Sequence, residues 1–193
     1  MLPIMKKTIC VAGPTCAGST FVANNLAKYL DGRVLSGDHY ETLVFNYYPE
    51  FFRSIYHNEN PKTWQEAKKI CDMGTVEQYQ AYNSNITILV ENMMRRNMTD
   101  KTTIIDWKQS PASELWTPEK SVFVNSYENL RAESYNKHLN PQDVNLSKQI
   151  IAKHDNIYAN SITAAKRAKH CIFNNRDENL EKQIVMVAKD LQF

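Results

Sequence analysis

One strand-loop-helix stretch near the start of the chain constrains the fold more than any other feature. Thr8–Ala12 is a short run of apolar and β-branched residues that is typical of a buried strand. The loop that follows begins and ends with a glycine, Gly13 and Gly18. Apolar residues then recur at helical spacing from Val22 to Leu30. A helix that begins directly after such a loop presents unpaired N–H groups and its positive dipole end, and together they form a site for an anion.

The loop matches a phosphate-binding pattern at all but one of its defining positions. In G-x-x-x-x-G-K-[ST] the backbone N–H groups face the phosphates, the lysine reaches the terminal phosphates and the hydroxyl residue binds Mg²⁺. Gly13, Gly18 and Thr20 fit, whereas Ser19 stands where the lysine belongs. An ordinary turn that binds nothing is the alternative, and the flanking strand and helix favour phosphate binding. The predicted binding residues are Gly13, Thr15, Cys16, Ala17, Gly18, Ser19 and Thr20.

Two carboxylates follow predicted strands, where sheets of this kind place ligand-binding residues. Asp38 lies in the polar stretch Ser36–Tyr40, which we interpret as a turn. It is a candidate to accept the proton of an attacking hydroxyl or to orient Mg²⁺, and the alternative is a helix N-cap. Asp106 ends a β-rich run and, with Thr20, is a candidate Mg²⁺ ligand; a turn residue is the alternative.

Strand and helix patterns alternate about five times along the 193 residues. This predicts one α/β domain, a doubly wound parallel five-stranded sheet with ligands at the carboxyl ends of its strands. Residues 127–155 form two helices that carry Arg131, Lys137 and Lys148. We predict that they form a mobile lid over phosphates, and a solvated charged face is the alternative. The predicted strands are Thr8–Ala12, Arg33–Leu35, Thr102–Asp106, Ser121–Asn125 and Cys171–Phe173.

The composition of the chain argues against several classes of binding partner. The net charge of +2 gives no strongly basic field, so a nucleic acid is not expected as a partner. The four cysteines form no C-x-x-C pair, which argues against zinc and a disulfide framework. No apolar run approaches the ~18 residues of a membrane span. We therefore expect a cytoplasmic protein without a membrane partner.

The end of the chain adds a resemblance. The run Ala164–Asn175 and the helix after it are similar to dephospho-coenzyme A kinases, which are P-loop small-molecule kinases. The resemblance implies that Asn174 or Asn175 lies near the adenine of ATP, that Arg131 covers the transferred group and that Asp38 serves the acceptor hydroxyl. The chain departs from that family at Ser19, in a missing glycine after the asparagines and in a lid with fewer arginines. Lys137 and Lys148 are candidates for a substitute cation.

The first part of the chain has a second resemblance. Gly13–Thr20, followed by Leu35–Asp38, is similar to the start of isopentenyltransferases that prenylate adenine, and this likeness stops near Tyr40. The prediction is an ATP- and Mg²⁺-dependent kinase. Its acceptor would be a hydroxyl or phosphate of a small molecule such as a nucleoside, a nucleotide or a dephospho-coenzyme A-like compound. The alternatives are a catalytically degenerate nucleotide-binding protein, which Ser19 favours, and an isopentenyltransferase-like enzyme.

Overall fold

A computed structural model describes residues 7–50, 61–113, 118–139 and 143–192 of the chain. The chain forms two compact units. The sheet unit comprises Met1–Ser36 and Met98–Phe193, and the helical unit comprises Gly37–Asn97. Each unit is described separately below.

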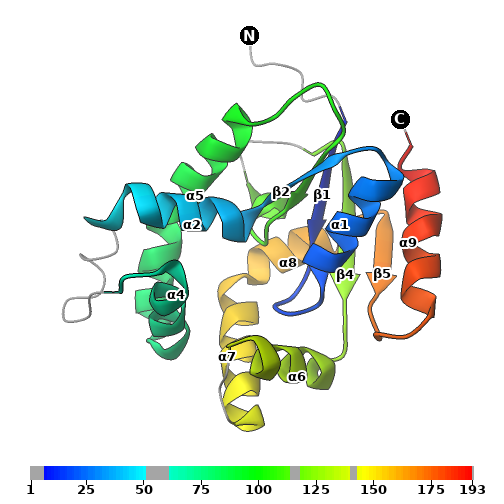
Figure 1. Cartoon of the computed structure of the whole chain (residues 1–193). Helices are drawn as coiled ribbons and strands as arrows, with labels where there is room; N and C mark the ends of the chain where they lie inside the picture. Colours follow the sequence, from blue (N-terminus) through cyan, green and yellow to red (C-terminus); the bar gives the residue numbers. More distant parts are fainter. Residues whose placement is uncertain (1–6, 51–60, 114–117, 140–142, 193) are drawn as a thin grey trace. The chain divides into compact units, whose positions relative to one another are not determined.

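A five-stranded parallel sheet is the centre of the sheet unit (Figure 1). The strand order is β2-β3-β1-β4-β5, and every neighbouring pair is parallel. The predicted fold class is therefore confirmed, and each predicted strand overlaps an observed one. The strands are β1 Thr8–Ala12, β2 Arg33–Ser36, β3 Thr103–Asp106, β4 Lys120–Asn125 and β5 His170–Phe173.

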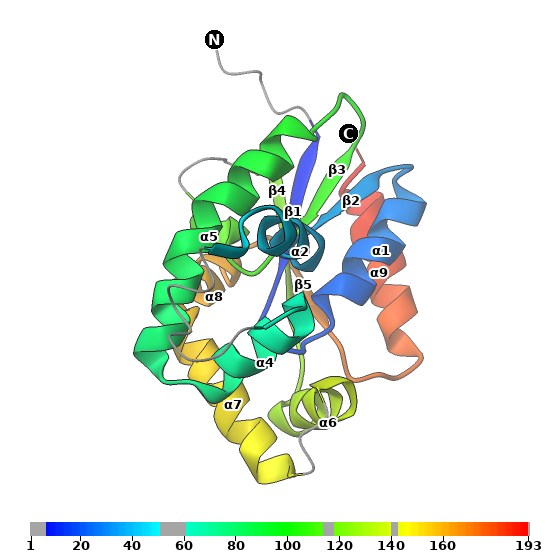
Figure 2. The ribbon, with the colours of Figure 1, turned by 60° about the vertical axis from the view of Figure 1, so that its left-hand side comes forward.

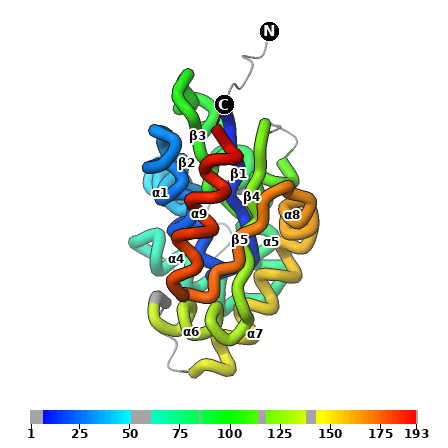
Figure 3. The backbone as a smooth tube through the Cα atoms, turned by 90° about the vertical axis from the view of Figure 1, so that its right-hand side faces the viewer, coloured from blue at the N-terminus to red at the C-terminus, as the bar shows by residue number. Residues whose placement is uncertain are grey.

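Helices cover both faces of this sheet (Figure 3). The first face packs against α1 (Ser19–Tyr29) and α9 (Asn179–Asp190), and the core there includes Ile9 and Val11 of β1. The alternate β1 residue Cys10 faces the other way and packs with Ala165 at the end of α8 (Ala159–Ala165). Side chains alternate across a strand, so a strand covered on both faces must be apolar throughout. This explains the uninterrupted apolar sequence of β1.

Two further helices lie at the carboxyl ends of the strands (Figures 1 and 2). They are α6 (Glu128–Leu139) and α7 (Val144–Ile157), and Asp143 caps α7 by accepting a hydrogen bond from the N–H of Asn145. The two helices share an apolar cluster. They span the predicted lid region, apart from residues 140–142, which lie outside the described residues.

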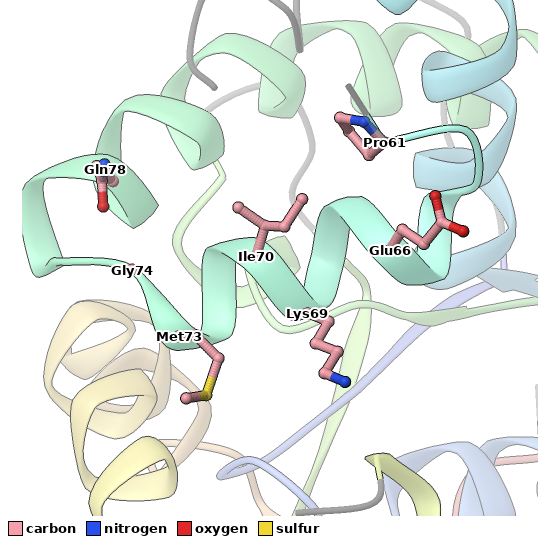
Figure 4. A pocket seen from close by; sticks show the side chains of 7 residues that line it. All are labelled: Pro61, Glu66, Lys69, Ile70, Met73, Gly74 and Gln78. Atoms are coloured by element: carbon pink, nitrogen blue, oxygen red, sulfur yellow. The ribbon is translucent and has the colours of Figure 1, made fainter. Parts of the chain in front are cut away.

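Three helices are described in the helical unit: α2 (Gly37–Tyr47), α4 (Trp64–Met73) and α5 (Val76–Arg96). The rings of Trp64 and Tyr82 stack at 5.7 Å between centroids. A hollow of about 570 Å³ lies beside α4 (Figure 4). Its lining residues are Pro61, Glu66, Lys69, Ile70, Met73, Gly74 and Gln78.

One local prediction about this unit is wrong. The stretch Ser36–Tyr40 is not a polar turn, because β2 ends at Ser36 and α2 begins at Gly37. The reason is packing: Tyr40 and Val44 are spaced one helical turn apart and are both buried, so a helix starts here directly. In the described part of the chain, no helix has both the length and the apolar character needed to cross a membrane.

The buried thiol of Cys10 makes stability depend on pH. Its Sγ lies 2.7 Å from Ser110 Oγ. Burial raises the pKa of the Cys10 thiol from 9.0 to about 12, against the opposing effect of the Ser110 hydrogen bond. Above about pH 9 the unfolded chain loses this proton while the folded chain keeps it, so folding stability falls as pH rises.

We expect the unfolding free energy of the wild type to decrease more steeply than that of Cys10→Ala between about pH 9 and pH 11, by up to about 1.4 kcal/mol per pH unit. Urea denaturation of both proteins at several pH values measures the difference. Equal slopes would show that Cys10 does not remain protonated in the fold.

Candidate phosphate-binding site

The loop between β1 and α1 has a backbone that requires its two glycines. A Cβ atom on Gly13 would lie 1.9 Å from the carbonyl oxygen of Val124, so β4 leaves no room for a side chain there. Gly18 has φ +92° and would place a Cβ 2.3 Å from Nδ2 of Asn174. Cys16 also has positive φ, at 60°. The glycines therefore serve a specific loop conformation that brings the backbone close to its neighbours.

The loop ends at the N-terminus of a helix. Gly18 is the N-cap of α1, and the first helical bond runs from the N–H of Val22 to the carbonyl oxygen of Gly18 at 3.1 Å. The N–H groups of Ser19, Thr20 and Phe21 precede that bond, and helix geometry gives such groups no acceptor within the helix. Together with the helix dipole they favour a negatively charged ligand. The backbone thus fits the phosphates of a nucleotide.

Asn174, at the end of β5, supports this loop. Its Nδ2 donates to the carbonyl oxygen of Ala17 at 2.9 Å, and its backbone N–H donates to the carbonyl oxygen of Asn125 at 2.8 Å. The residue is buried. Asn174 therefore ties the loop to the neighbouring end of β4, a role that the sequence did not indicate.

Three charged side chains form hydrogen bonds with Thr15. Lys108 Nζ donates to Thr15 Oγ1 at 3.0 Å, and Arg131 Nη1 donates to the Thr15 carbonyl oxygen at 3.3 Å. The Thr15 N–H donates to Asp155 Oδ1 at 3.2 Å, while Asp155 Oδ2 pairs with Arg131 at 2.7 Å. The ammonium group of Lys108 also lies 5.4 Å from the ring centroid of Tyr158.

Sequence reasoning identified Arg131 and missed Asp155. It placed the connection that contains Lys108 over the ligand crevice but gave Lys108 no role. Asp155 lies on α7, where nothing in the local pattern distinguishes it from other polar residues. Lys108 offered a better signal, since it stands two residues after the end of β3, where ligand-binding residues of parallel sheets collect.

The candidate Mg²⁺ ligands lie in different parts of the sheet unit. Asp106 is the last residue of β3 and is buried, and its register partner on β1 is Val11, two residues before Gly13. Thr20 is exposed in the first turn of α1. The described residues contain no group of three or more His, Cys, Asp or Glu that could hold a metal. Mg²⁺ bound to a nucleotide takes only one or two protein ligands, with phosphates and waters as the rest.

A pocket of about 690 Å³ opens beside the loop. The aromatic ring of Phe21, on the first turn of α1, belongs to its wall, and the residue is 55% exposed. Asn174 lines the pocket, whereas Asn175 does not belong to the lining. The residues that line it are Gly18, Phe21, Asn25, Tyr29, Ser134, Asn174, Arg176, Asp177, Glu178, Leu180, Glu181 and Ile184.

Arg176 connects this pocket to α6. Its backbone has φ +59°, and its guanidinium donates to the Leu130 carbonyl oxygen and to Ser134 Oγ. Both acceptors belong to α6, so the β5–α9 connection and the predicted lid are linked directly.

Asp38 belongs to the helical unit. It lies in the first turn of α2 and not at an N-cap, so that alternative for it is wrong. Its side chain is 70% exposed and pairs with Lys68 Nζ at 3.2 Å. Burial alone would lower the pKa of Lys68, but the charges of Asp38, Glu41 and Asp72 outweigh it and raise that pKa. The carboxylate of Asp38 therefore faces a permanent cation.

Solved structures share this fold, and two of the three reported below are kinases. TT1252 from Thermus thermophilus aligns with a TM-score of 0.68 at 12% identity, over 95% of both chains. Dephospho-CoA kinase from Campylobacter jejuni aligns with a TM-score of 0.55 at 14% identity, over 98% of this chain and 99% of that one. Shikimate kinase from Bacteroides thetaiotaomicron aligns with a TM-score of 0.59 at 14% identity, over 95% of this chain and 97% of that one.

No protein-family model matches the sequence, and no curated protein matches it either. At identities of 12% to 14% these likenesses define the fold. The chain has a P-loop kinase-like fold.

Proposed function

We propose that the protein is an ATP-dependent small-molecule kinase. The observation that carries the proposal is the loop from Gly13 to Thr20, which ends at a helix N-terminus. Gly13 is required by its close contact with the backbone of β4, and Gly18 by its positive φ. This is the arrangement that binds the phosphates of nucleotides in proteins of this fold. The likeness to dephospho-CoA and shikimate kinases supports the same reaction class.

The pocket beside the loop is the proposed site of the adenine base. The exposed ring of Phe21 offers a face on which a base can stack. Asn174 and Asn175 are proposed to lie near the base, with Asn174 also holding the loop. Thr20 and Asp106 are the proposed Mg²⁺ ligands, and the metal would neutralise charge on the phosphates.

The proposed reaction is an in-line displacement. The acceptor oxygen forms a bond to the γ-phosphorus of ATP as the bond to the β-phosphate oxygen breaks, and ADP leaves with that oxygen. Asp38 takes the proton of the acceptor hydroxyl. Arg131, with neighbouring cations of the lid, residues 127–155, covers the transferred group. The acceptor is a small molecule with a hydroxyl or phosphate.

A second candidate is a protein that binds a nucleotide but does not catalyse phosphoryl transfer from it. The presence of Ser19 at the lysine position favours it, because that lysine stabilises charge on the transferred group in related loops. An isopentenyltransferase-like activity is the third candidate, and it rests on the likeness of Gly13–Thr20 and Leu35–Asp38 alone.

A thermal-shift panel separates these candidates. The wild type is heated with ATP, ADP, dephospho-coenzyme A, shikimate or dimethylallyl diphosphate, each with and without Mg²⁺. A ligand at 100 times its dissociation constant adds about 2.7 kcal/mol of stability. A kinase is stabilised by ATP and consumes it when an acceptor is added, whereas the second candidate is stabilised without consuming it. A shift with the prenyl diphosphate alone would contradict the kinase assignment.

A further inference from the structure

The loop lacks a lysine at position 19, and the structure brings another lysine to it. We propose that Lys108, in the connection after β3, binds the terminal phosphates of the nucleotide in place of a loop lysine. The inference rests on the proposed function and adds a residue to it.

The geometry places the ammonium group of Lys108 directly on the loop. Its Nζ donates to Oγ1 of Thr15 at 3.0 Å, and Thr15 is the third residue of the loop and is buried. The Lys108 side chain is half-buried, with its ammonium 5.4 Å from the ring centroid of Tyr158. Contacts with the hydroxyl and with the ring therefore hold the cation beside the loop in the absence of ligand.

Position along the fold supports the same assignment. β3 is the neighbour of β1, and it ends at Asp106, the proposed Mg²⁺ ligand. Lys108 thus leaves the sheet at the edge where phosphates would meet the loop. A cation that reaches them from a neighbouring strand end would supply the same charge as a lysine within the loop.

Arg131 and Lys137, two lid cations singled out from the sequence, are the competing candidates. Arg131 contacts the same threonine through its carbonyl oxygen, and its guanidinium pairs with Asp155 at 2.7 Å. Lys137, a candidate from the sequence, is exposed on α6.

An ammonium group can exchange its hydrogen bond to Thr15 for one to a phosphate oxygen when a nucleotide binds. An ammonium group has three N–H donors, so one group can also bind both Thr15 Oγ1 and a phosphate oxygen. Its four-carbon stem is flexible, so the group can turn toward a phosphate oxygen while it stays near the loop. A hydrogen bond in which both groups are charged is stronger than the bond from the ammonium to a neutral hydroxyl.

The test measures binding by isothermal titration calorimetry with ATP, ADP and adenosine, so it does not depend on turnover. Lys108→Met removes the charge and keeps most of the apolar stem. We expect it to weaken ATP and ADP binding by about 10- to 100-fold and to leave adenosine binding within about twofold. Lys189→Met, on the exposed last turn of α9, is the matched control and should bind all three ligands like the wild type.

Rescue sharpens the test. Ser19→Lys in the Lys108→Met background returns the charge to the loop, and it should recover most of the lost ATP affinity. Lys108→Arg retains the charge and is therefore a second variant in case Lys108→Met does not fold. The unfolding midpoint of each variant, measured without ligand, shows whether it is folded. It should keep more ATP affinity than Lys108→Met.

The outcomes distinguish the inference from the proposed function. Wild-type ATP affinity in Lys108→Met, or an equal loss for ATP and adenosine, would overturn the role of Lys108 and leave nucleotide binding intact. Absence of any nucleotide binding to the wild type would overturn the proposed function, and this inference with it.

Discussion

Replacing Gly13 with alanine is expected to lower the unfolding free energy by about 3 kcal/mol or more, and to abolish nucleotide binding. The added methyl group would lie 1.9 Å from the carbonyl oxygen of Val124 and 3.0 Å from its carbonyl carbon. Both atoms belong to the backbone of β4, which is paired on both sides in the sheet and cannot retreat without breaking strand contacts. The loop would have to move instead. Urea denaturation gives the change in stability.

Gly74→Ala is the matched control. A Cβ atom there would lie 2.7 Å from Oε1 of Gln78, the far end of a flexible side chain, and Gly74 does not have positive φ. Gln78 can rotate away only by giving up its capping hydrogen bond from the N–H of Thr75, so we expect a cost of about 1 to 2 kcal/mol, less than for Gly13→Ala. If Gly13→Ala were as stable as Gly74→Ala, the close approach of the loop to β4 would be contradicted.

Asp38→Asn is expected to lower the rate of phosphoryl transfer by about 10²- to 10⁴-fold, the range of a positioned general base. The amide cannot accept the proton of the acceptor hydroxyl. ATP affinity should stay within about twofold, because Asp38 is proposed to serve the acceptor and not the nucleotide. Steady-state kinetics with the acceptor found by the ligand panel, together with ATP titration, separate the two effects.

Glu41→Gln provides the control for charge. Glu41 lies on α2 and, like Asp38, raises the pKa of Lys68, so its removal changes the electrostatics of the same cluster. We expect the rate of Glu41→Gln to stay within about threefold of the wild type. Unchanged phosphoryl transfer by Asp38→Asn with every accepted substrate would show that this carboxylate is not the base.

Most of the fold could be predicted from the sequence because the buried strands are short apolar runs and the helices have clear periodicity. β1 and β4 are examples, each apolar where it is covered on both faces. The start of α2 could not be predicted as readily. Ser36, Gly37 and Asp38 are residues that favour turns, and the buried Tyr40 and Val44 that favour a helix there follow only afterwards.

The site was predictable where backbone conformation limits residue choice. Gly13 and Gly18 are visible in the sequence because only glycine suits their positions. The contacts of Lys108 and Asp155 with Thr15 could not be predicted, because both residues reach it from more than 90 residues away in the chain. Side-chain contacts over that separation follow from packing and leave no periodic signal. Asn174 was singled out by resemblance, but its hydrogen bond to the loop required the structure.

The central claim is that the loop from Gly13 to Thr20 binds the phosphates of a nucleotide. The chain contains only five glycines, so protein labelled with ¹⁵N at glycine alone gives five backbone amide resonances. Two of these glycines, Gly13 and Gly18, lie at the two ends of the loop, while Gly32 and Gly74 lie elsewhere in the fold. Substitution of single glycines assigns the resonances.

Titration with ADP, compared with adenosine, is the most direct test. The claim predicts that ADP shifts the Gly13 and Gly18 resonances strongly and that Gly32 and Gly74 stay in place. Adenosine should shift Gly13 much less than ADP does, whereas it can shift Gly18, which lines the proposed adenine pocket. Resonances of Gly13 and Gly18 that do not move at saturating ADP would contradict it.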